Sequence, residues 1–461
     1  MGLLILDGEL DGECLDIRCT DGRVSEIGRR LRPAAGDEVL TAGGGVVLPG
    51  LHDHHVHLLA MAAAASSVVM DSTGVDEIAR RHRIIPAGTW LRAVGYHESI
   101  SGLLDRDGLE ALAPGRPVRV QHRSGAMWVL SSTAVEQLGV DQFEAAGVER
   151  DSQGRATGRL YGLDWWLRGK APRVALDLRS VSRQLSGYGV TGVTDATPTD
   201  DAEDLRVLAD ARRRQDLMQR VTVTGGLRLD PLAEPQLSRG PVKLIVADHS
   251  LPDVSQLAAD IARSHDQQRP VALHCVTRVA LVIALAAWQE VGAWSGDRVE
   301  HGGVIGPEQA AMVRELGLTV VTQPNFVAER GDQYRIDVDP EDQPYLYPCG
   351  SLLERGVPVG GSTDAPYGHA DPWKAMTAAV TRSTESGHVL GGVERVDGAR
   401  ALALFLGPPQ QPGGPVRRVE VGAPADLCVM ARPWREVVVE LDAALVLATV
   451  LDGQLVRVEQ H

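Results

Sequence analysis

The chain has 461 residues, of which 44% are hydrophobic and only 4% aromatic, and it carries a formal net charge of −15. This acidic balance and the absence of a basic run argue against nucleic acid or an anionic membrane surface as a partner, and they favour a small-molecule substrate. The N-terminus lacks a secretory pattern, and no stretch runs about 18 residues without a charge or a helix breaker. We therefore expect a soluble, cytoplasmic protein.

Both ends of the chain alternate short apolar runs with turn residues. Residues 1–48 contain the turn signals Asp7-Gly8, Asp21-Gly22 and Gly43-Gly44-Gly45, which are typical of hairpins. The other end repeats the pattern in three expected strands, Val419–Gly422, Asp426–Met430 and Ala448–Val456. We expect the strands of residues 1–48 and 406–461 to pair into one small β-sandwich. The Pro/Gly-rich segment 407–415 marks the exit from a central domain.

The centre of the chain, residues 49–405, alternates apolar strands with helical stretches. The expected helices are 201–219, 253–267, 278–290 and 307–316. The expected strands are Val46–His57, Val190–Ala196, Val221–Thr224, Val242–Ala247, Val271–His274, Arg298–His301, Leu318–Gln323 and Val357–Thr363. Eight parallel strands suffice to close a (β/α)8 TIM-like barrel, so the expected class is α/β with this barrel; an open doubly wound sheet is the alternative.

A long segment, about 60–185, is inserted after the first barrel strand. It contains Trp128, Trp165 and Trp166 in a chain with few aromatic residues. An insertion at the carboxyl end of a barrel strand suits a lid or a pocket wall, although structural packing is the more common role for any one of these tryptophans.

Residues of metal-ligand type recur where the apolar strands end. The first strand ends in His52-Asp53-His54-His55-Val56-His57, and alternation along a strand puts Asp53, His55 and His57 on one face. Lys243, His274, His301 and Asp364 follow at later strand ends. One such histidine is usually structural, but the set together predicts a site for Zn²⁺ or another divalent transition metal.

Lys243 is unusual because the chain has 46 basic residues and only three lysines, Lys170, Lys243 and Lys374. It lies in an apolar strand, where a free ammonium is expensive to bury. A lysine can react with CO₂ to form an anionic carbamate that bridges two cations, which arginine cannot do. The alternatives are a lysine that extends to solvent or pairs with Asp248.

These motifs resemble the amidohydrolase superfamily of metal-dependent hydrolases. The order His-x-His, Lys, His, His, Asp carries the resemblance, and the following segments look like its YtcJ-like branch (amidohydrolase family 3): Pro49–Leu58, Arg116-Pro117-Val118, Gly189-Val190-Thr191, Val242-Lys243-Leu244, Glu300-His301, Gln323-Pro324, Asp364-Ala365-Pro366 and Gly422–Leu427.

The resemblance implies one or two divalent ions and a place for each ligand. It puts His55, His57 and Asp364 on one metal, His274 and His301 on a second, and carbamylated Lys243 between them. Asp53 would orient the imidazoles without binding metal.

The implied reaction is hydrolysis of a non-peptide C–N bond in an amide, an N-formyl or N-acyl compound, or a cyclic amide. Metal-activated hydroxide attacks the carbonyl, and Asp364 moves the proton to the leaving nitrogen. Candidate substrate-pocket residues are Tyr96, His97, Trp128, Trp165 and Gln323.

Other activities remain open on the same scaffold. They are a mononuclear hydrolase or deaminase with unmodified Lys243, a metal-dependent isomerase or decarboxylase, and a ligand-binding regulator. A homodimer is one assembly that the sequence allows.

Overall fold

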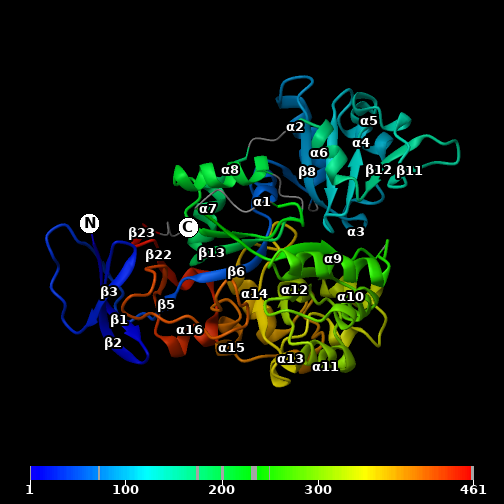
Figure 1. Cartoon of the computed structure of the whole chain (residues 1–461). Coiled ribbons are helices and arrows are strands. Elements are labelled where there is room, and N and C mark those ends of the chain that lie inside the picture. Colours follow the sequence, from blue (N-terminus) through cyan, green and yellow to red (C-terminus); the bar gives the residue numbers. More distant parts are fainter. Residues whose placement is uncertain are drawn as a thin grey trace. The chain divides into compact units, whose positions relative to one another are not determined.

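The computed structural model describes residues 2–70, 73–172, 176–198, 202–229, 236–248 and 250–457. Their Cα positions form two compact units (Figure 1). Unit 1 comprises Met1–His57 with Val181–His461, and unit 2 comprises Leu58–Ser180. Both units combine helices and strands, so the expected α/β class is confirmed. Within the ranges described, no helix is long and apolar enough to cross a membrane.

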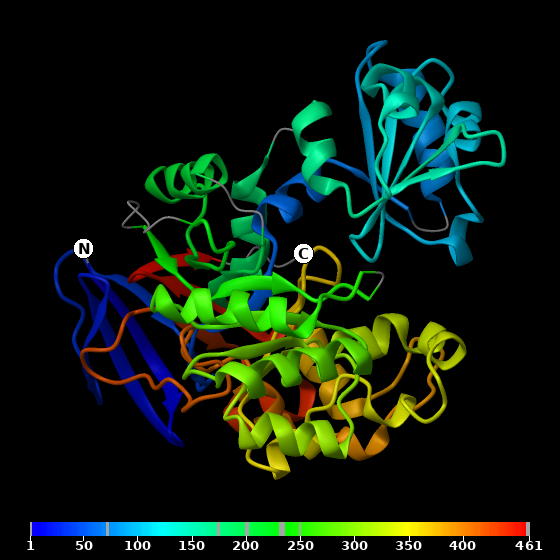
Figure 2. The same cartoon turned by 45° about the vertical axis from the view of Figure 1, so that its right-hand side comes forward.

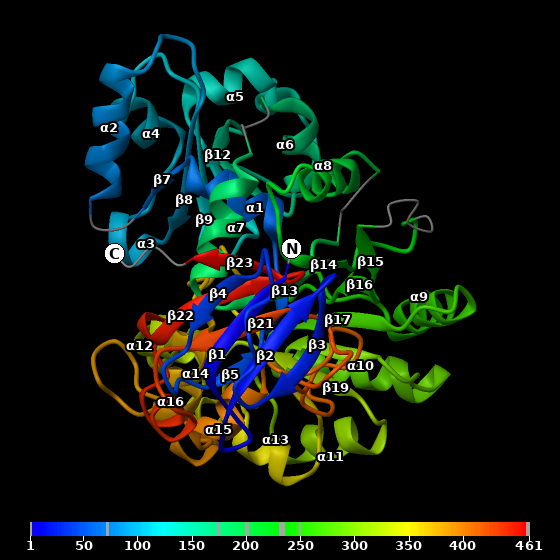
Figure 3. The same ribbon diagram turned by 90° about the vertical axis from the view of Figure 1, so that its left-hand side faces the viewer.

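Strands from the two ends of the chain form two four-stranded sheets, which lie next to each other (Figure 3). The first has the order β3-β2-β1-β4, with bounds β1 Leu3–Leu10, β2 Glu13–Thr20, β3 Arg23–Gly28 and β4 Glu38–Thr41. The second has the order β23-β22-β21-β5, with bounds β5 Val47–Pro49, β21 Leu427–Met430, β22 Val446–Leu451 and β23 Gln454–Arg457. Buried side chains of both sheets, among them Ile5, Ile17, Leu427 and Val450, form one hydrophobic cluster. Residues 1 and 458–461 of the expected sandwich lie outside the described ranges.

Two of the expected turn and strand positions in this region are wrong. Asp7-Gly8 is not a hairpin turn; it lies inside β1, where the pairing register with β2 shifts and Asp7 has a φ of 53°. Val419–Gly422 is not a strand, because Ala423 N donates to Glu420 O and the chain turns there, with Gly422 at a φ of 93°. The turn gives backbone N–H and C=O groups hydrogen-bond partners that a neighbouring strand would otherwise supply.

The expected strand Val46–His57 is two strands in two different sheets. Val47–Pro49 is β5, antiparallel to β21, whereas β6, Leu51–Val56, is parallel to β13. Gly50 separates them and packs tightly, since a Cβ added there would lie 2.1 Å from Thr191 Cγ2. An apolar run alone could not distinguish one strand from two, because both pieces are buried.

The remaining strands of unit 1 form two parallel sheets. One has the order β15-β14-β13-β6, with bounds β13 Val190–Asp195, β14 Arg220–Val223 and β15 Leu237–Arg239. The other runs from β16 to β20, with bounds β16 Val242–Ile245, β17 Val271–Cys275, β18 Arg298–His301, β19 Thr319–Thr322 and β20 Val359–Gly361. Backbone hydrogen bonds link the edges of the two sheets: Lys243 N donates to Gly225 O at 2.8 Å, and Asp364 N donates to His55 O at 2.9 Å.

Helices connect these strands as the apolar spacing predicts. The expected helices correspond to α8 Ala202–Arg213, α9 Val254–Asp266, α10 Arg278–Val291 and α11 Pro307–Glu315. Residue 201 lies outside the described ranges, and α8 ends six residues before the expected 219, near Gln215 with its φ of 58°. The side chains of Asp253 and Thr277 cap α9 and α10, which lie side by side and pack against β17 (Figure 2).

The rest of unit 1 is completed by short elements. The helices are α12 Asn325–Asp337, α13 Gly350–Glu354, α14 Pro372–Thr381, α15 Gly398–Ala403 and α16 Trp434–Glu440. The single turns of 3₁₀ helix are η2 Gln343–Tyr345, η3 Gly392–Glu394 and η4 Ala443–Leu445.

Unit 2 has its own six-stranded sheet of order β11-β12-β10-β9-β8-β7, in which β7, β8 and β9 are parallel. Its strands are β7 Val68–Val69, β8 Leu91–Tyr96, β9 Val118–His122, β10 Met127–Leu130, β11 Val148–Arg150 and β12 Ala156–Tyr161. Its helices are α1 Leu58–Ala65, α2 Gly74–Ile84, α3 Glu98–Ser101, α4 Arg106–Leu112, α5 Ser132–Leu138, η1 Val140–Gln142 and α6 Asp164–Lys170, and α7 Leu178–Gly187 then leads back to unit 1. Two hydrophobic clusters give this unit a core of its own.

The close contact at Gly50 yields a stability prediction. Gly50→Ala places a Cβ against Thr191, which overpacks the junction of β5 and β6, so we expect a loss of about 1–3 kcal/mol of unfolding free energy. Gly187→Ala is the matched control, because a Cβ there meets no atom within 4 Å. Thermal unfolding of both variants measures the difference. Equal stability of the two variants would show that the junction is not tightly packed.

Candidate metal centre

Three ligand-type side chains converge where β6 and β20 end. The ligand atoms of His55, His57 and Asp364 all lie within 4.8 Å of one another. Asp364 Oδ1 lies 3.2 Å from His57 Nε2 and 3.5 Å from His55 Nε2. This oxygen is buried and has no hydrogen-bond partner among the described residues. A buried carboxylate oxygen without a partner is costly, so the arrangement suits a cation between the three groups.

The other predicted ligands join the same group. The ring centroid of His301 lies 4.8 Å from that of His55 and 4.4 Å from that of His274. Lys243 Nζ lies 3.5 Å from His55 Nε2, and the lysine is buried. Strand order explains the convergence, because β16, β17 and β18 are parallel neighbours whose carboxyl ends share one edge.

Two of these residues have an unusual backbone conformation. His301 has a φ of 68° and Asp364 a φ of 56°. A positive φ costs a residue with a Cβ roughly 1 kcal/mol or more, and such residues cluster at functional sites. His301 is the last residue of β18, whereas Asp364 lies in the turn that follows β20.

Buried polar partners set the orientation of each imidazole. Glu300 Oε2 contacts His55 Nδ1, which directs Nε2 toward Asp364. Thr197 Oγ1 lies 3.1 Å from His57 Nδ1, and Gln323 Oε1 lies 2.9 Å from His301 Nδ1. Partners of this kind fix the tautomer and the position of metal-binding histidines.

The role of Glu300 was missed by sequence reasoning, which used it only as part of a motif. A signal was present, because Arg298 and Glu300 stand two residues apart in an otherwise apolar strand and therefore share a face. In the structure both are buried and form an ion pair, with Arg298 Nε 2.5 Å from Glu300 Oε1. Burial alone would raise the pKa of Glu300, but the charges of Arg298, Lys243 and His301 outweigh it and hold the pKa below its usual value.

Asp53 hydrogen-bonds the main chain and the Thr363 hydroxyl, and its role in orienting the imidazoles stays a prediction. Its carboxylate accepts hydrogen bonds from the backbone N–H of His55 at 3.2 Å, from Thr363 N at 3.2 Å and from Thr363 Oγ1 at 2.6 Å. Burial raises its pKa to about 7. Asp53 therefore ties β6 to the segment after β20 through the main chain.

Burial favours the neutral forms of His55, His274 and His301. It lowers the pKa of Lys243 to about 8 and that of His274 to about 3, and it lowers the pKa of His55 and His301 well below the usual value. Neutral imidazoles are the form that binds a metal ion. With one carboxylate, this donor set fits Zn²⁺ or another divalent transition metal.

Among the predicted substrate-pocket residues, Gln323 is in unit 1 and contacts this group through His301. It is buried, and its Nε2 donates to Ser362 Oγ at 2.8 Å. The other four are in unit 2. Tyr96 is buried and its hydroxyl bonds Gly102 O and Leu104 N, whereas His97 is partly buried.

The two tryptophans differ in environment. Trp128 is buried, donates from Nε1 to Asp164 at 2.7 Å and lies under the guanidinium groups of Arg92 and Arg119. The Trp165 side chain, by contrast, is 64% exposed. Their assignment to a substrate pocket stays a prediction.

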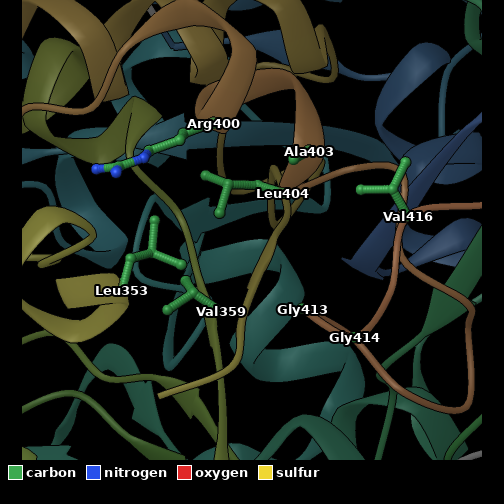
Figure 4. A pocket seen from close by; sticks show the side chains of 8 residues that line it. All are labelled: Leu353, Val359, Arg400, Ala403, Leu404, Gly413, Gly414 and Val416. Carbon is green, nitrogen blue, oxygen red and sulfur yellow. The ribbon is translucent and has the colours of Figure 1, made fainter. Parts of the chain in front are cut away.

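Unit 1 also contains a cavity of about 250 Å³ (Figure 4). It is lined by Leu353, Val359, Arg400, Ala403, Leu404, Gly413, Gly414 and Val416. None of these is a predicted ligand, and Arg400 is the one charged side chain among them, so this cavity lacks the chemistry for hydrolysis.

Comparison with known proteins agrees with the site. Residues 38–457 match the model of a family described as the amidohydrolase family. The chain is 27% identical over 510 aligned positions to an N-substituted formamide deformylase from Arthrobacter pascens, covering 94% of this chain and 93% of the relative. It is also 22% identical to the Bacillus subtilis (strain 168) amidohydrolase YtcJ over 75% of each chain.

The fold is shared with a solved structure. An uncharacterized metal-dependent hydrolase from Pyrococcus horikoshii OT3 superposes with a TM-score of 0.75 at 18% identity, covering 94% of this chain and 98% of that one. Because the family match spans most of the sequence, this chain belongs to the amidohydrolase family. It is a metal-dependent hydrolase that acts on carbon–nitrogen bonds of small molecules.

The contact between Glu300 and His55 generates a prediction. Glu300→Gln keeps the shape of the side chain but weakens its hold on the imidazole, so we expect metal affinity to fall about 10–100-fold. Competition with a coloured chelator measures the affinity, and circular dichroism checks folding. Glu315→Gln, at an exposed position in α11, is the control. Unchanged affinity in a folded Glu300→Gln protein would contradict the positioning role.

Proposed function

We propose that this protein hydrolyses N-substituted formamides or closely related N-acyl amides, with Zn²⁺ as the divalent metal. The observation that carries the proposal is the convergence of His55, His57 and Asp364 on one point, with an oxygen of Asp364 left unpartnered. The similarity to a formamide deformylase over nearly the full length of both chains supports the formyl group as the acyl part.

In this proposal His55, His57 and Asp364 would hold one ion, His274 and His301 would hold a second, and Lys243, as a carbamate, would supply an anionic group shared by both. The buried position of Lys243 beside His55 supports this role, because an anionic carbamate between two cations is better accommodated there than an ammonium. The depressed pKa of Lys243, about 8, leaves part of the amine neutral and able to react with CO₂ near pH 7.

Divalent metal in this position supplies the Lewis acidity that makes water nucleophilic near neutral pH. Asp364 then accepts the proton of the attacking water and transfers it to the leaving nitrogen, so that the C–N bond breaks to give formate and an amine. Glu300 and Gln323 hold His55 and His301 in place throughout, since both are buried and already in contact with the rings.

We also propose the domain arrangement expected from the sequence. Residues 49–405 would form a closed barrel, and residues 1–48 with 406–461 would form a β-sandwich beside it. The backbone hydrogen bonds that join β16 to the end of β14, and β6 to the segment after β20, support closure, and the shared hydrophobic cluster supports the sandwich. The inserted segment, about 60–185, would influence substrate choice through side chains such as Trp165.

The reaction is tested with matched substrates that differ in the acyl group. We expect N-butylformamide to yield formate and butylamine faster than N-butylacetamide or hydantoin reacts. We also expect His55→Ala to lower bound metal and to reduce turnover by at least about a hundredfold, since a ligand is lost. Turnover of hydantoin alone would replace the formamide proposal with a cyclic amide. Full activity in metal-free protein would contradict the proposed metal-dependent hydrolysis.

Lys243 separates the two-metal mechanism from the one-metal alternative. We expect Lys243→Ala and Lys243→Arg to lose about one equivalent of metal and most activity, because neither side chain can form the carbamate and arginine adds a positive charge. Lys374→Ala, which changes an exposed lysine, should behave as wild type. Full metal content and near-normal rates in Lys243→Ala would leave a single ion as the better account.

A further inference from the structure

A second cluster of metal-ligand side chains lies wholly within unit 2. It consists of His97 and Glu98, directly after β8, and His122, the last residue of β9. Their ligand atoms all lie within 4.8 Å of one another. Because β8 and β9 are parallel neighbours, with Tyr96 paired to His122, both imidazoles leave the same edge of the sheet.

The two imidazoles are directed at one carboxylate oxygen. Glu98 Oε2 lies 3.4 Å from His122 Nε2 and 3.8 Å from His97 Nε2, and the ring centroids are 5.4 Å apart. Both histidine side chains are 15% exposed and Glu98 is 39% exposed. The group is therefore sheltered but open to an ion from solvent.

Each imidazole is also fixed through its other nitrogen in the same way. A serine stands two residues after each histidine, and the hydroxyls of Ser99 and Ser124 lie 2.7 Å from Nδ1 of His97 and His122. A serine oxygen can accept Nδ1–H, which leaves Nε2 unprotonated and able to bind a metal ion. Burial, the largest cause, lowers the pKa of His122 and favours its neutral form.

We propose that His97, Glu98 and His122 bind a divalent transition metal ion, with Zn²⁺ the best match, at a site formed by residues of unit 2 alone. Two imidazoles and one carboxylate form a donor set that Zn²⁺ accepts, with water in the fourth position. The ion would join the ends of β8 and β9 and so stabilise the turns that follow them. This site does not depend on the proposed reaction, because none of its residues belongs to unit 1.

A hydrogen-bonded cluster is the competing explanation. The backbone N–H groups of Ser99 and Ser124 lie 3.2 and 3.1 Å from the same Nδ1 atoms. A ring that accepts from them carries its proton on Nε2 and donates to Glu98, with no ion required. The two explanations differ in metal stoichiometry, which decides between them.

The test measures metal bound to the full-length protein after chelation and reloading with Zn²⁺. We expect wild type to bind one equivalent more than His97→Ala, His122→Ala or Glu98→Gln. The matched control, Glu136→Gln, changes an exposed glutamate on α5 and should bind as wild type. The conservative Glu98→Gln variant retains the side-chain shape, so the test does not depend on alanine variants that fail to fold.

A second readout is independent of total metal content. Zn²⁺ should raise the melting temperature of His55→Ala protein, in which the catalytic site is impaired, more than that of the His55→Ala/Glu98→Gln double variant, because an ion that binds only the folded state stabilises that state. Equal stoichiometry in wild type and Glu98→Gln, together with equal Zn²⁺ stabilisation in both His55→Ala proteins, would overturn the proposal in favour of the hydrogen-bonded cluster.

Discussion

Ionisable side chains at the ends of parallel strands are costly to bury unless they share partners, and this constraint governs unit 1. Glu300 is the central case. It lies between Arg298 and the imidazole of His55, so one buried carboxylate neutralises an arginine and orients a predicted metal ligand. Lys243 then lies beside His55, and Asp364 lies against His55 and His57. Removal of one member would leave its neighbours without a buried partner, which is why the fold and the site cannot be separated energetically.

Hydrogen bonds to main-chain groups hold the frame around these side chains. Asp53 accepts from the backbone of His55 and of Thr363, and Asp364 N donates to His55 O, so β6 and the segment after β20 keep a fixed spacing. The positive φ values of His301 and Asp364 are maintained in this setting. A rigid frame of this kind keeps ligand atoms in position for a cation, and a hydrolase of the amidohydrolase family needs that preorganisation before any substrate arrives.

The strand ends that carry ligands could be predicted because period-2 apolar runs stop at polar residues, and β17 and β18 begin and end within one residue of expectation. The division at Gly50 could not, because β5 and β6 are both buried and the break depends on close contact with Thr191 from a distant strand. The role of Glu300 was also missed, because it depends on a contact with His55, which is 245 residues away in the sequence. The sheet of unit 2 has short strands in mixed directions, and no periodic signal in the segment gives that order.

The central claim is that His55, His57 and Asp364 hold a metal ion, and anomalous scattering from crystals of the active protein tests it most directly. Data collected on both sides of the zinc absorption edge should give a difference peak about 2.0–2.2 Å from Nε2 of His55, Nε2 of His57 and a carboxylate oxygen of Asp364. A further difference peak, between this first ion and Lys243, would mark the second ion. Fully active crystals with no anomalous peak among these three residues, at the zinc edge or at that of another transition metal, would contradict the account.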